Sequence, residues 1–417
     1  MSEEKPNVPK LRFPGFADPW EQRKLGEIAH RIIRKNGGNQ SNLPLTISAQ
    51  YGLVDQRDYF NNQVASRDMS GYYLLQNGEF AYNKSTSGDS PWGAVKRLTK
   101  YENGCVSTLY ICFGLDEGDS DFLVTYYETD RWHKEVRMIA AEGARNHGLL
   151  NIAPSDFFET ELTMPAEIEE QAQIGAFFQQ LDSLITLHQR KLDHLKEMKK
   201  GLLQKMFPKN GESIPELRFP GFTDPWEQRK LGEIAEIVGG GTPNTSVEEY
   251  WDGDIDWYTP AELGDRRYVD SSLRKITQAG YDNSSARMLP ANRTILFTSR
   301  AGIGNTAILC SSACTNQGFQ SLVVGDSADV DFIYSLSDDI KRKAEIKASG
   351  STFLEISGKR LTEIEVLAPA LVEQVQIGSF FRQLDSLIAL HQREETYVSE
   401  TARMICRNCV IRAGSSF

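Results

Sequence analysis

The sequence predicts an α+β protein built as an internal repeat, with two tandem domains joined by long helices. Three observations support this prediction. A near-identical segment opens each half of the chain, and a second near-identical segment closes each half. The intervals between these segments hardly resemble each other. The chain therefore contains two copies of one framework around inserts that do different work.

The first repeated segment opens each half. Residues 9–29 and 215–235 are identical at nineteen of twenty-one positions, with an offset of 206. Each copy places phenylalanine, proline, tryptophan and glycine before a short apolar-periodic piece, which is typical of a compact, turn-rich lead. We expect this segment to dock against its own half, because so many apolar side chains are costly to leave in water.

The second repeated segment closes each half. Residues 170–190 and 373–393 match at seventeen of twenty-one positions, with an offset of 203. From Ala166 to Met206 no proline interrupts the chain, and an apolar stripe recurs every seven residues. This pattern predicts a helix of roughly 60 Å, at ~1.5 Å per residue, which is too long to be buried in one small domain. His188 and His391 lie in the stripe, where a register-setting role is favoured over a ligand.

The two copies diverge abruptly after the second segment. KLDHLKEMKKGLLQKMFP follows Arg190, whereas EETYVSETARMICRNCVIRAGSSF follows Arg393. We expect the heptad pattern to stop there and the first helix to lack a full-length partner beyond about His391. The predicted parts are a first domain at 11–164, a central spacer helix at 165–208, a second domain at 215–368, a second spacer helix at 369–393 and an atypical tail at 394–417.

Each insert mixes short strands with turn residues, as irregular α+β domains do. The expected strands are 72–75, 79–82 and 106–113 in the first insert, and 255–258, 294–298, 306–309 and 321–324 in the second. The inserts also share a faint common order, which aligns 78–88 with 292–302, 121–127 with 331–337, and 143–157 with 349–361. We therefore expect one fold with different surface loops.

Composition narrows the functional classes. The net charge is 46 − 57 = −11 and the pI is about 5.2, which argues against non-specific coating of nucleic acid. Residues 188–209 nevertheless hold seven Lys or Arg and could form a local basic face. No apolar run approaches twenty residues, so we expect a cytoplasmic protein with no membrane partner. Six cysteines are too few for a disulfide framework, and Cys406 and Cys409 lack the further ligands of a zinc site.

The motifs of common catalytic sites are missing. The sequence has no GxxxxGK[ST], HExxH or GxSxG motif, and no NPPY-like or DPPY-like run of an amino-methyltransferase. Paired carboxylates do not occur at matching places in the two halves. We therefore expect no catalytic residue, no metal and no cofactor in this chain.

The inserts instead carry polar and aromatic loops of the kind that read DNA. Arg pairs bidentately with guanine, and Asn or Gln with adenine. Each such cluster alone is more often a plain turn, and only the matched placement in both halves favours a functional interpretation. The candidate DNA-binding residues are Tyr82, Asn83, Lys84, Ser85, Trp92, Arg145, Asn146 and His147 in the first insert, and Thr298, Ser299, Arg300, Asn316 and Gln317 in the second.

A family resemblance accounts for these features together. LRFPGFxDPWEQRKLGEI, EQxxIGxFFxQLDxLIxLHQRKL, GGTP, WYTP, SRxGIG and TNQGF resemble the specificity subunit of type I restriction-modification systems, from about Leu11 to Arg393. The resemblance implies two target-recognition domains, each reading one half of a bipartite asymmetric site in double-stranded DNA. It also implies long antiparallel spacer helices that form a coiled coil, and a pseudo-twofold relation between the halves.

The resemblance further implies partners that do the chemistry. Two methyltransferase (modification) subunits, which use S-adenosylmethionine, would dock on the spacer helices. Restriction subunits, which translocate and cut DNA with ATP, would join them, while the specificity subunit itself is non-catalytic. The tail after Arg393 departs from the family pattern, which leaves a truncated, inactive subunit as one alternative. A non-catalytic adaptor that binds only proteins on a coiled coil is the other.

Overall fold

The computed structural model describes residues 8–48, 51–60, 66, 68–88, 90–140, 148–209, 211–264, 266–300, 302–348 and 354–409. These residues form two compact units whose boundaries fall inside two helices of 39 residues each. The first unit combines the chain up to His188 with the chain from Glu394 onward, and the second unit is Gln189–Arg393. Strands and helices are mixed in both units, which confirms the predicted α+β class.

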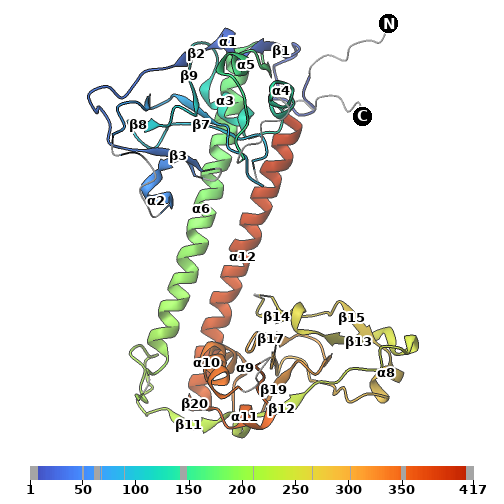
Figure 1. Ribbon diagram of the computed structural model, residues 1–417. Coiled ribbons are helices and arrows are strands. Elements are labelled where there is room, and N and C mark those ends of the chain that lie inside the picture. Colours follow the sequence, from blue (N-terminus) through green and yellow to red (C-terminus); the bar gives the residue numbers. More distant parts are fainter. Residues whose placement is uncertain are drawn as a thin grey trace. The chain divides into compact units, whose positions relative to one another are not determined.

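The first unit contains ten strands and five short helices among its described residues, followed by the long helix α6 (Figure 1). In chain order these are β1 (Glu21–Lys24), α1 (Leu25–Ile28), β2 (Ala29–Ile32), β3 (Leu45–Ser48), β4 (Gly52–Asp55), α2 (Gln56–Phe60), β5 (Tyr73–Gln76), β6 (Phe80–Asn83), β7 (Ala94–Arg97), β8 (Asn103–Val106), β9 (Ile111–Leu115), α3 (Ser120–Tyr127), α4 (His133–Ile139), α5 (Pro154–Phe158), β10 (Glu161–Met164) and α6 (Ile168–Met206).

The sheet of the first unit has the strand order β2-β9-β6-β7, with antiparallel neighbours. Phe80 of β6 stacks on Phe113 of β9, with ring centroids 5.1 Å apart. Phe122 of α3 and Ile174 of α6 complete the same core, so the start of the long helix is part of this unit. The expected strand at 106–113 is in fact two strands, β8 and β9, separated by a turn at 107–110.

The second unit repeats this plan with additional strands (Figure 1). Its elements are β11 (Glu227–Lys230), α7 (Leu231–Ile234), β12 (Ala235–Gly239), η1 (Glu248–Tyr250), β13 (Trp251–Tyr258), η2 (Pro260–Glu262), β14 (Tyr268–Val269), β15 (Arg274–Ile276), α8 (Gln278–Asp282), β16 (Thr294–Phe297), β17 (Thr306–Leu309), β18 (Cys314–Thr315), β19 (Gln320–Val324), α9 (Val330–Ser335), α10 (Ser337–Lys347), α11 (Gly358–Thr362), β20 (Glu365–Ala368) and α12 (Leu371–Cys409).

The main sheet of the second unit has the order β12-β19-β16-β17-β14. Its first four strands match β2-β9-β6-β7 of the first unit, and β14 is an addition that pairs parallel with β17. Ile295, Phe332 and Phe381 are fully buried in the core between this sheet, α9 and α12. One framework thus supports both inserts.

The two repeated segments of each half contact each other. Strand β1 pairs antiparallel with β10, and β11 pairs with β20 in the same way. An arginine of each first segment then reaches the start of the long helix: Arg12 donates to both oxygens of Glu170 at 2.7 and 2.8 Å, and Arg218 to both oxygens of Glu373 at 2.7 Å. Both carboxylates are 1% exposed. The expected docking of the first segment therefore occurs within each unit.

A glutamine and a glycine in each second segment receive a helix from the insert. In the first unit, Gln171 accepts the N–H of Asp119 at 2.9 Å, and Asp119 caps α3. A Cβ at Gly175 would lie 2.6 Å from the backbone nitrogen of Phe122. Glycine is required there because α3 sits directly on the long helix. In the second unit, Gln374 accepts the backbone N–H of the residue that caps α9, and Gly378 leaves room for the close approach of that helix.

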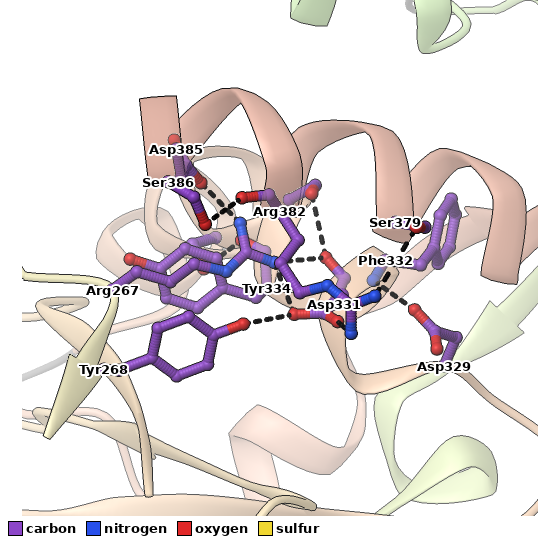
Figure 2. A network of polar contacts seen from close by, with 12 residues as sticks. Arg267, Tyr268, Asp329, Asp331, Phe332, Tyr334, Ser379, Arg382, Asp385 and Ser386 are labelled. Carbon is purple, nitrogen blue, oxygen red and sulfur yellow. Dashed lines mark hydrogen bonds and ion pairs between the residues drawn. The ribbon is translucent and has the colours of Figure 1, made fainter. Parts of the chain in front are cut away.

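A network of buried charges ties the second insert to α12 (Figure 2). Arg267 donates to Asp331 of α9 at 2.7 Å and to Asp385 of α12 at 2.5 Å. Its guanidinium carbon lies 4.5 Å from the centroid of the Tyr334 ring. Arg382 also reaches Asp331, at 3.2 Å. Because Arg267 precedes β14, the network fixes the strand that the second unit adds to the common sheet.

The tail differs from expectation. Helix α12 does not end near Arg393 but continues to Cys409. The reason is visible in the spacing: Ile377, Leu384, His391, Val398 and Ile405 recur every seven residues, so the apolar stripe does not stop. In the first unit, Ala402 is buried and Ile405 packs against the main core. The tail after Arg393 therefore keeps the helical pattern of the first copy, and it differs from that copy mainly in having no lysine.

Within the described residues, no helix combines the length and apolarity needed to cross a membrane.

Candidate nucleic-acid interface

Strand registers decide which residues of the two units are equivalent. Ala29 pairs with Leu115 in the first unit, and Ala235 pairs with Val324 in the second. Ala29 and Ala235 occupy the same position of the repeated segment, 206 residues apart. Leu115 of β9 is therefore equivalent to Val324 of β19.

The next strand corrects the alignment of the inserts. Phe80 pairs with Phe113, which lies two residues before Leu115. Ile295 pairs with Leu322, which lies two residues before Val324. Phe80 is therefore equivalent to Ile295, one residue away from the alignment of 78–88 with 292–302. A shift of one residue exchanges the two faces of a strand. The faint sequence similarity was thus wrong in register here.

Backbone pairing beyond the strands agrees with the corrected register. Ser85 bridges to Leu149, and Arg300 bridges to Glu355. Leu149 and Glu355 lie in the segments 143–157 and 349–361, whose resemblance the sequence indicated only coarsely. Ser85 and Arg300 therefore occupy equivalent positions, at the point where the chain leaves the sheet. The first unit presents a hydroxyl where the second presents a guanidinium.

Three candidate residues are buried and have structural roles. Tyr82 is fully buried in β6, donates its hydroxyl hydrogen to the carbonyl of Trp92 at 2.8 Å and stacks on Phe157. Thr298 and Ser299 are also fully buried. These three side chains are therefore not exposed for contact with DNA in this structure, because core clusters cover both faces of the sheet at β6 and β16.

The remaining candidates of the first unit lie at the end of β6. Asn83 is half-buried and its side-chain oxygen accepts the N–H of Ser85 at 3.0 Å. Lys84 donates to the carbonyl of Ile152 at 3.3 Å, and burial lowers the pKa of its ammonium. Ser85 is exposed, and Trp92 is half-buried against the main core.

The predicted sites at Arg145, Asn146 and His147 lie outside the described residues.

In the second unit a hairpin loop displays Arg300. The Thr298 hydroxyl donates to the carbonyl of Gly302 and accepts the N–H of Asn305 at 2.9 Å, which closes the loop between β16 and β17. Ile303 is buried and anchors it. Within the described part of the chain, the Arg300 side chain forms no hydrogen bond or ion pair. Arg300 is half-buried at this position.

A second loop displays Gln317 beside the first. Asn316 accepts the N–H of Gly318 at 2.8 Å and so shapes the turn between β18 and β19. The carbonyl of Gly318 accepts the N–H of Ser299 at 2.8 Å, which joins this turn to the strand that leads to Arg300. Gln317 is exposed and accepts the Thr242 hydroxyl. The structure thus brings the two predicted clusters of the second insert together.

The glycine-rich run at 239–243 is a support for this turn. Gly241 donates its N–H to the carbonyl of Thr315 at 2.8 Å, and its own carbonyl accepts the Trp257 indole N–H at 2.8 Å. A Cβ at Gly240 would lie 2.0 Å from the carbonyl oxygen of Asn316. Glycine is needed because the two backbones nearly touch.

The first unit contains a turn equivalent to Asn316–Phe319 that sequence reasoning missed. With Leu115 equivalent to Val324, this turn is Ser107–Tyr110, inside the segment expected to be a continuous strand. The Ser107 hydroxyl accepts the N–H of Leu109 at 3.3 Å, and the Ser107 carbonyl accepts the N–H of Tyr110 at 3.1 Å. The signal was weak because STLY has strand-forming residues and no glycine or asparagine.

Comparison with known proteins finds a family model that matches part of the second half of the chain. Residues 223–399 match the family model described as "Type I restriction modification DNA specificity domain". This range begins in the first repeated segment of the second unit and ends within α12.

Curated relatives point the same way. Over 190 residues the chain is 35% identical to the type I restriction enzyme MjaIX specificity subunit of Methanocaldococcus jannaschii, covering 45% of this chain and 44% of the relative. Over 170 residues it is 32% identical to the EcoR124I/EcoR124II specificity subunit of Escherichia coli, covering 39% and 41%. The alignments therefore span less than half the length of these relatives.

Solved structures share the fold over nearly the whole chain. The S subunit of a type I restriction-modification system from M. genitalium superposes with a TM-score of 0.62 and 16% identity, covering 98% of this chain and all of that one. A chain from a study of complex assembly and conformational transition of the type I R-M system gives a TM-score of 0.53 and 17% identity, covering 96% and 99%.

Proposed function

Because residues 223–399 form a type I restriction modification DNA specificity domain, we propose that this protein is the specificity subunit of a type I restriction-modification complex. It reads a bipartite asymmetric site in double-stranded DNA through one recognition surface on each unit. The chain carries out no catalysis itself and holds no cofactor. It selects the DNA on which partner subunits act.

The observation that supports the proposal is that both units have the same framework but carry different loops on it. Both units repeat the Arg–Glu contact and the helix seated on a glycine. At equivalent exits from the sheet, the second unit displays Arg300 and Gln317, whereas the first displays Ser85 and the Ser107–Tyr110 turn. Arg and Gln are donors suited to base edges in the major groove. Different side chains at equivalent places suit an asymmetric site, because each half then reads its own sequence.

The long helices are the surfaces we assign to protein partners. Leu184, Leu187 and Met198 of α6 are at least 40% exposed, and so are Leu387 and Leu390 of α12. Rows of exposed apolar residues on helices are typical of protein interfaces. We assign them to two methyltransferase subunits, with restriction subunits joining the assembled complex. Antiparallel packing of the two spacer helices as a coiled coil is part of the same proposal.

The decisive experiment combines binding and methylation. The chain is purified with its methyltransferase subunits, and its binding is measured on a randomised DNA library at several salt concentrations. We expect one bipartite motif to be enriched, with the same motif methylated in host DNA. Binding that falls with salt but selects no sequence would instead favour a protein-binding adaptor with incidental DNA contacts. Specific binding without methylation would favour an inactive subunit.

Arg300→Ala tests the surface of the second unit. We expect the affinity for one half-site to fall by about 1–3 kcal/mol, because a bidentate base contact is lost. The other half-site should be unchanged, since the first unit is untouched. Arg293→Ala is a matched control, because Arg293 is a partly exposed arginine of the same unit that is paired with Asp326. Equal losses on unrelated DNA would mean that Arg300 contacts only phosphate.

A further inference from the structure

The turn Ser107–Tyr110 has the same pattern of hydrogen bonds as the turn Asn316–Phe319. In both, the first side chain accepts the N–H two residues on, and the first carbonyl accepts the N–H three residues on. The last residue of each turn is an aromatic residue that packs against a core. Phe319 is fully buried, and Tyr110 packs against the cluster that contains Leu45 and Leu53. The backbone of each turn is therefore shaped by hydrogen bonds of the turn itself.

The two turns differ in what they present at the third position. In the second unit this residue is Gly318, where a Cβ would lie 2.7 Å from Cγ of Pro260, so no side chain can project there. In the first unit the same position is Leu109, which is 57% exposed. The second position is Gln317 in one unit and the exposed Thr108 in the other. The second unit thus displays an amide, and the first displays a pair of methyl-bearing side chains.

Resting on the proposed function, we propose that Leu109 is a specificity-determining residue of the first unit, which contacts the C5-methyl group of a thymine. The methyl group distinguishes thymine from every other base in the major groove, and apolar side chains read it. A leucine on a preorganised turn is suited to this task, because little conformational entropy is lost on binding. Thr108 adds a hydroxyl and a methyl group beside it.

The test removes one methyl group at a time from the DNA. In the motif selected by the intact complex, each thymine is replaced singly by deoxyuridine, which lacks only the C5-methyl group. We expect one position in one half-site at which this replacement weakens binding by about fourfold, the effect of burying one apolar carbon. For the complex with Leu109→Ala, the same replacement should have no further effect, while deoxyuridine elsewhere acts as before.

Two variants serve as controls. Met138→Ala removes an apolar side chain of the same unit that is 63% exposed on α4, and it should leave the deoxyuridine profile unchanged. Leu109→Gln keeps a long side chain on the turn and should shift the preferred base at that position away from thymine. Unchanged affinity for the other half-site confirms that each variant complex has assembled.

The outcomes separate this inference from the proposed function. If the wild-type complex selects no motif, the proposed function itself fails. If it selects a motif but no thymine is methyl-sensitive, or if Leu109→Ala keeps the full sensitivity, only the assignment of Leu109 is overturned.

Discussion

Each unit contains an equivalent aspartate that is paired with an arginine, but the two arginines come from different elements of their inserts. Asp121 and Asp331 are the matching residues of α3 and α9, the helices seated on the long helices. In the first unit Arg97, at the end of β7, donates to Asp121 at 2.5 Å. In the second unit Arg267, from the chain before β14, donates to Asp331 at 2.7 Å (Figure 2). Both units therefore place an arginine next to this aspartate. The arginine lies in a different part of the chain in each unit, because the two inserts differ in topology.

This comparison distinguishes invariant contacts from interchangeable ones. The contacts made between the repeated segments, such as Arg218 with Glu373, use the same residues in both units. The contacts between an insert and the framework share the types of residue, arginine and aspartate, but the arginines are not at equivalent positions. Matched substitutions of the first kind should therefore cost the two units similar amounts of stability, and matched substitutions of the second kind should cost them different amounts.

The largest effect is expected from the arginine of the first repeated segment. Arg218→Met leaves Glu373 buried without its cation, which should cost about 3–5 kcal/mol of the stability of the second unit. Arg12→Met should cost the first unit a similar amount, because Arg12 makes the same two contacts with Glu170. Hydrogen exchange of amides in each unit measures both losses separately.

A double variant sharpens this prediction. Arg218→Met combined with Glu373→Leu removes both charges, so the second unit should recover much of the loss. A double variant no more stable than Arg218→Met alone would show that the loss comes from packing and not from the uncompensated charge.

An intermediate effect is expected at the interchangeable contact. Arg267→Met should destabilise the second unit by about 1–3 kcal/mol, through the donors lost to the buried Asp331 and the partly buried Asp385. The loss is smaller than at the first repeated segment because Lys199 still pairs with Asp385 and Arg382 with Asp331.

The matched variant in the first unit is Arg97→Met. Asp121 has 34% of its side chain exposed, against 9% for Asp331, so solvent compensates it more easily and the loss should be about 1 kcal/mol or less. Urea unfolding followed by hydrogen exchange compares the two. Equal losses in the two units would contradict the role assigned to burial.

The smallest effect is expected in the tail. Ile405→Ala removes a partly buried side chain from the core of the first unit and should cost that unit about 1 kcal/mol, below the usual range for a fully buried isoleucine. Ile405→Leu keeps the volume and should be nearly neutral. Replacing the tail by KLDHLKEMKKGLLQKMF should leave the stability of the first unit within about 1 kcal/mol, because the stripe is present in both sequences. Loss of the α12 amide protection beyond Arg393 in the unaltered chain would contradict the continuous helix.

The sequence by itself determined the framework. Identity between the repeated segments is so high that the docking of each first segment and the length of the first helix followed from residue type and spacing. Arg12 and Glu170, like Arg218 and Glu373, are retained in both copies. The family resemblance also followed from these segments and from short motifs such as SRxGIG, and the comparison with known proteins confirms it.

The inserts were less predictable because their similarity is weak. The alignment at β6 was wrong by one residue. Tyr82 was grouped with the polar residues that follow it, although its ring lies in the core. The tail was misread for a related reason. Glu394 and Glu395 hid a seven-residue spacing that Val398 and Ile405 continue.

Only the tertiary structure decided which side chains are displayed. Thr298 and Arg300 are two residues apart, yet Thr298 is fully buried and closes the hairpin loop, whereas Arg300 is only half-buried. Leu109 sits in a segment that reads as a continuous strand, because local propensity does not register the hydrogen bonds that the Ser107 hydroxyl and carbonyl make in the folded chain. Burial and turn geometry depend on strands far apart in the sequence. The sequence therefore predicted two recognition surfaces, and the packing of the sheet decided which of the candidate side chains are buried and which are exposed.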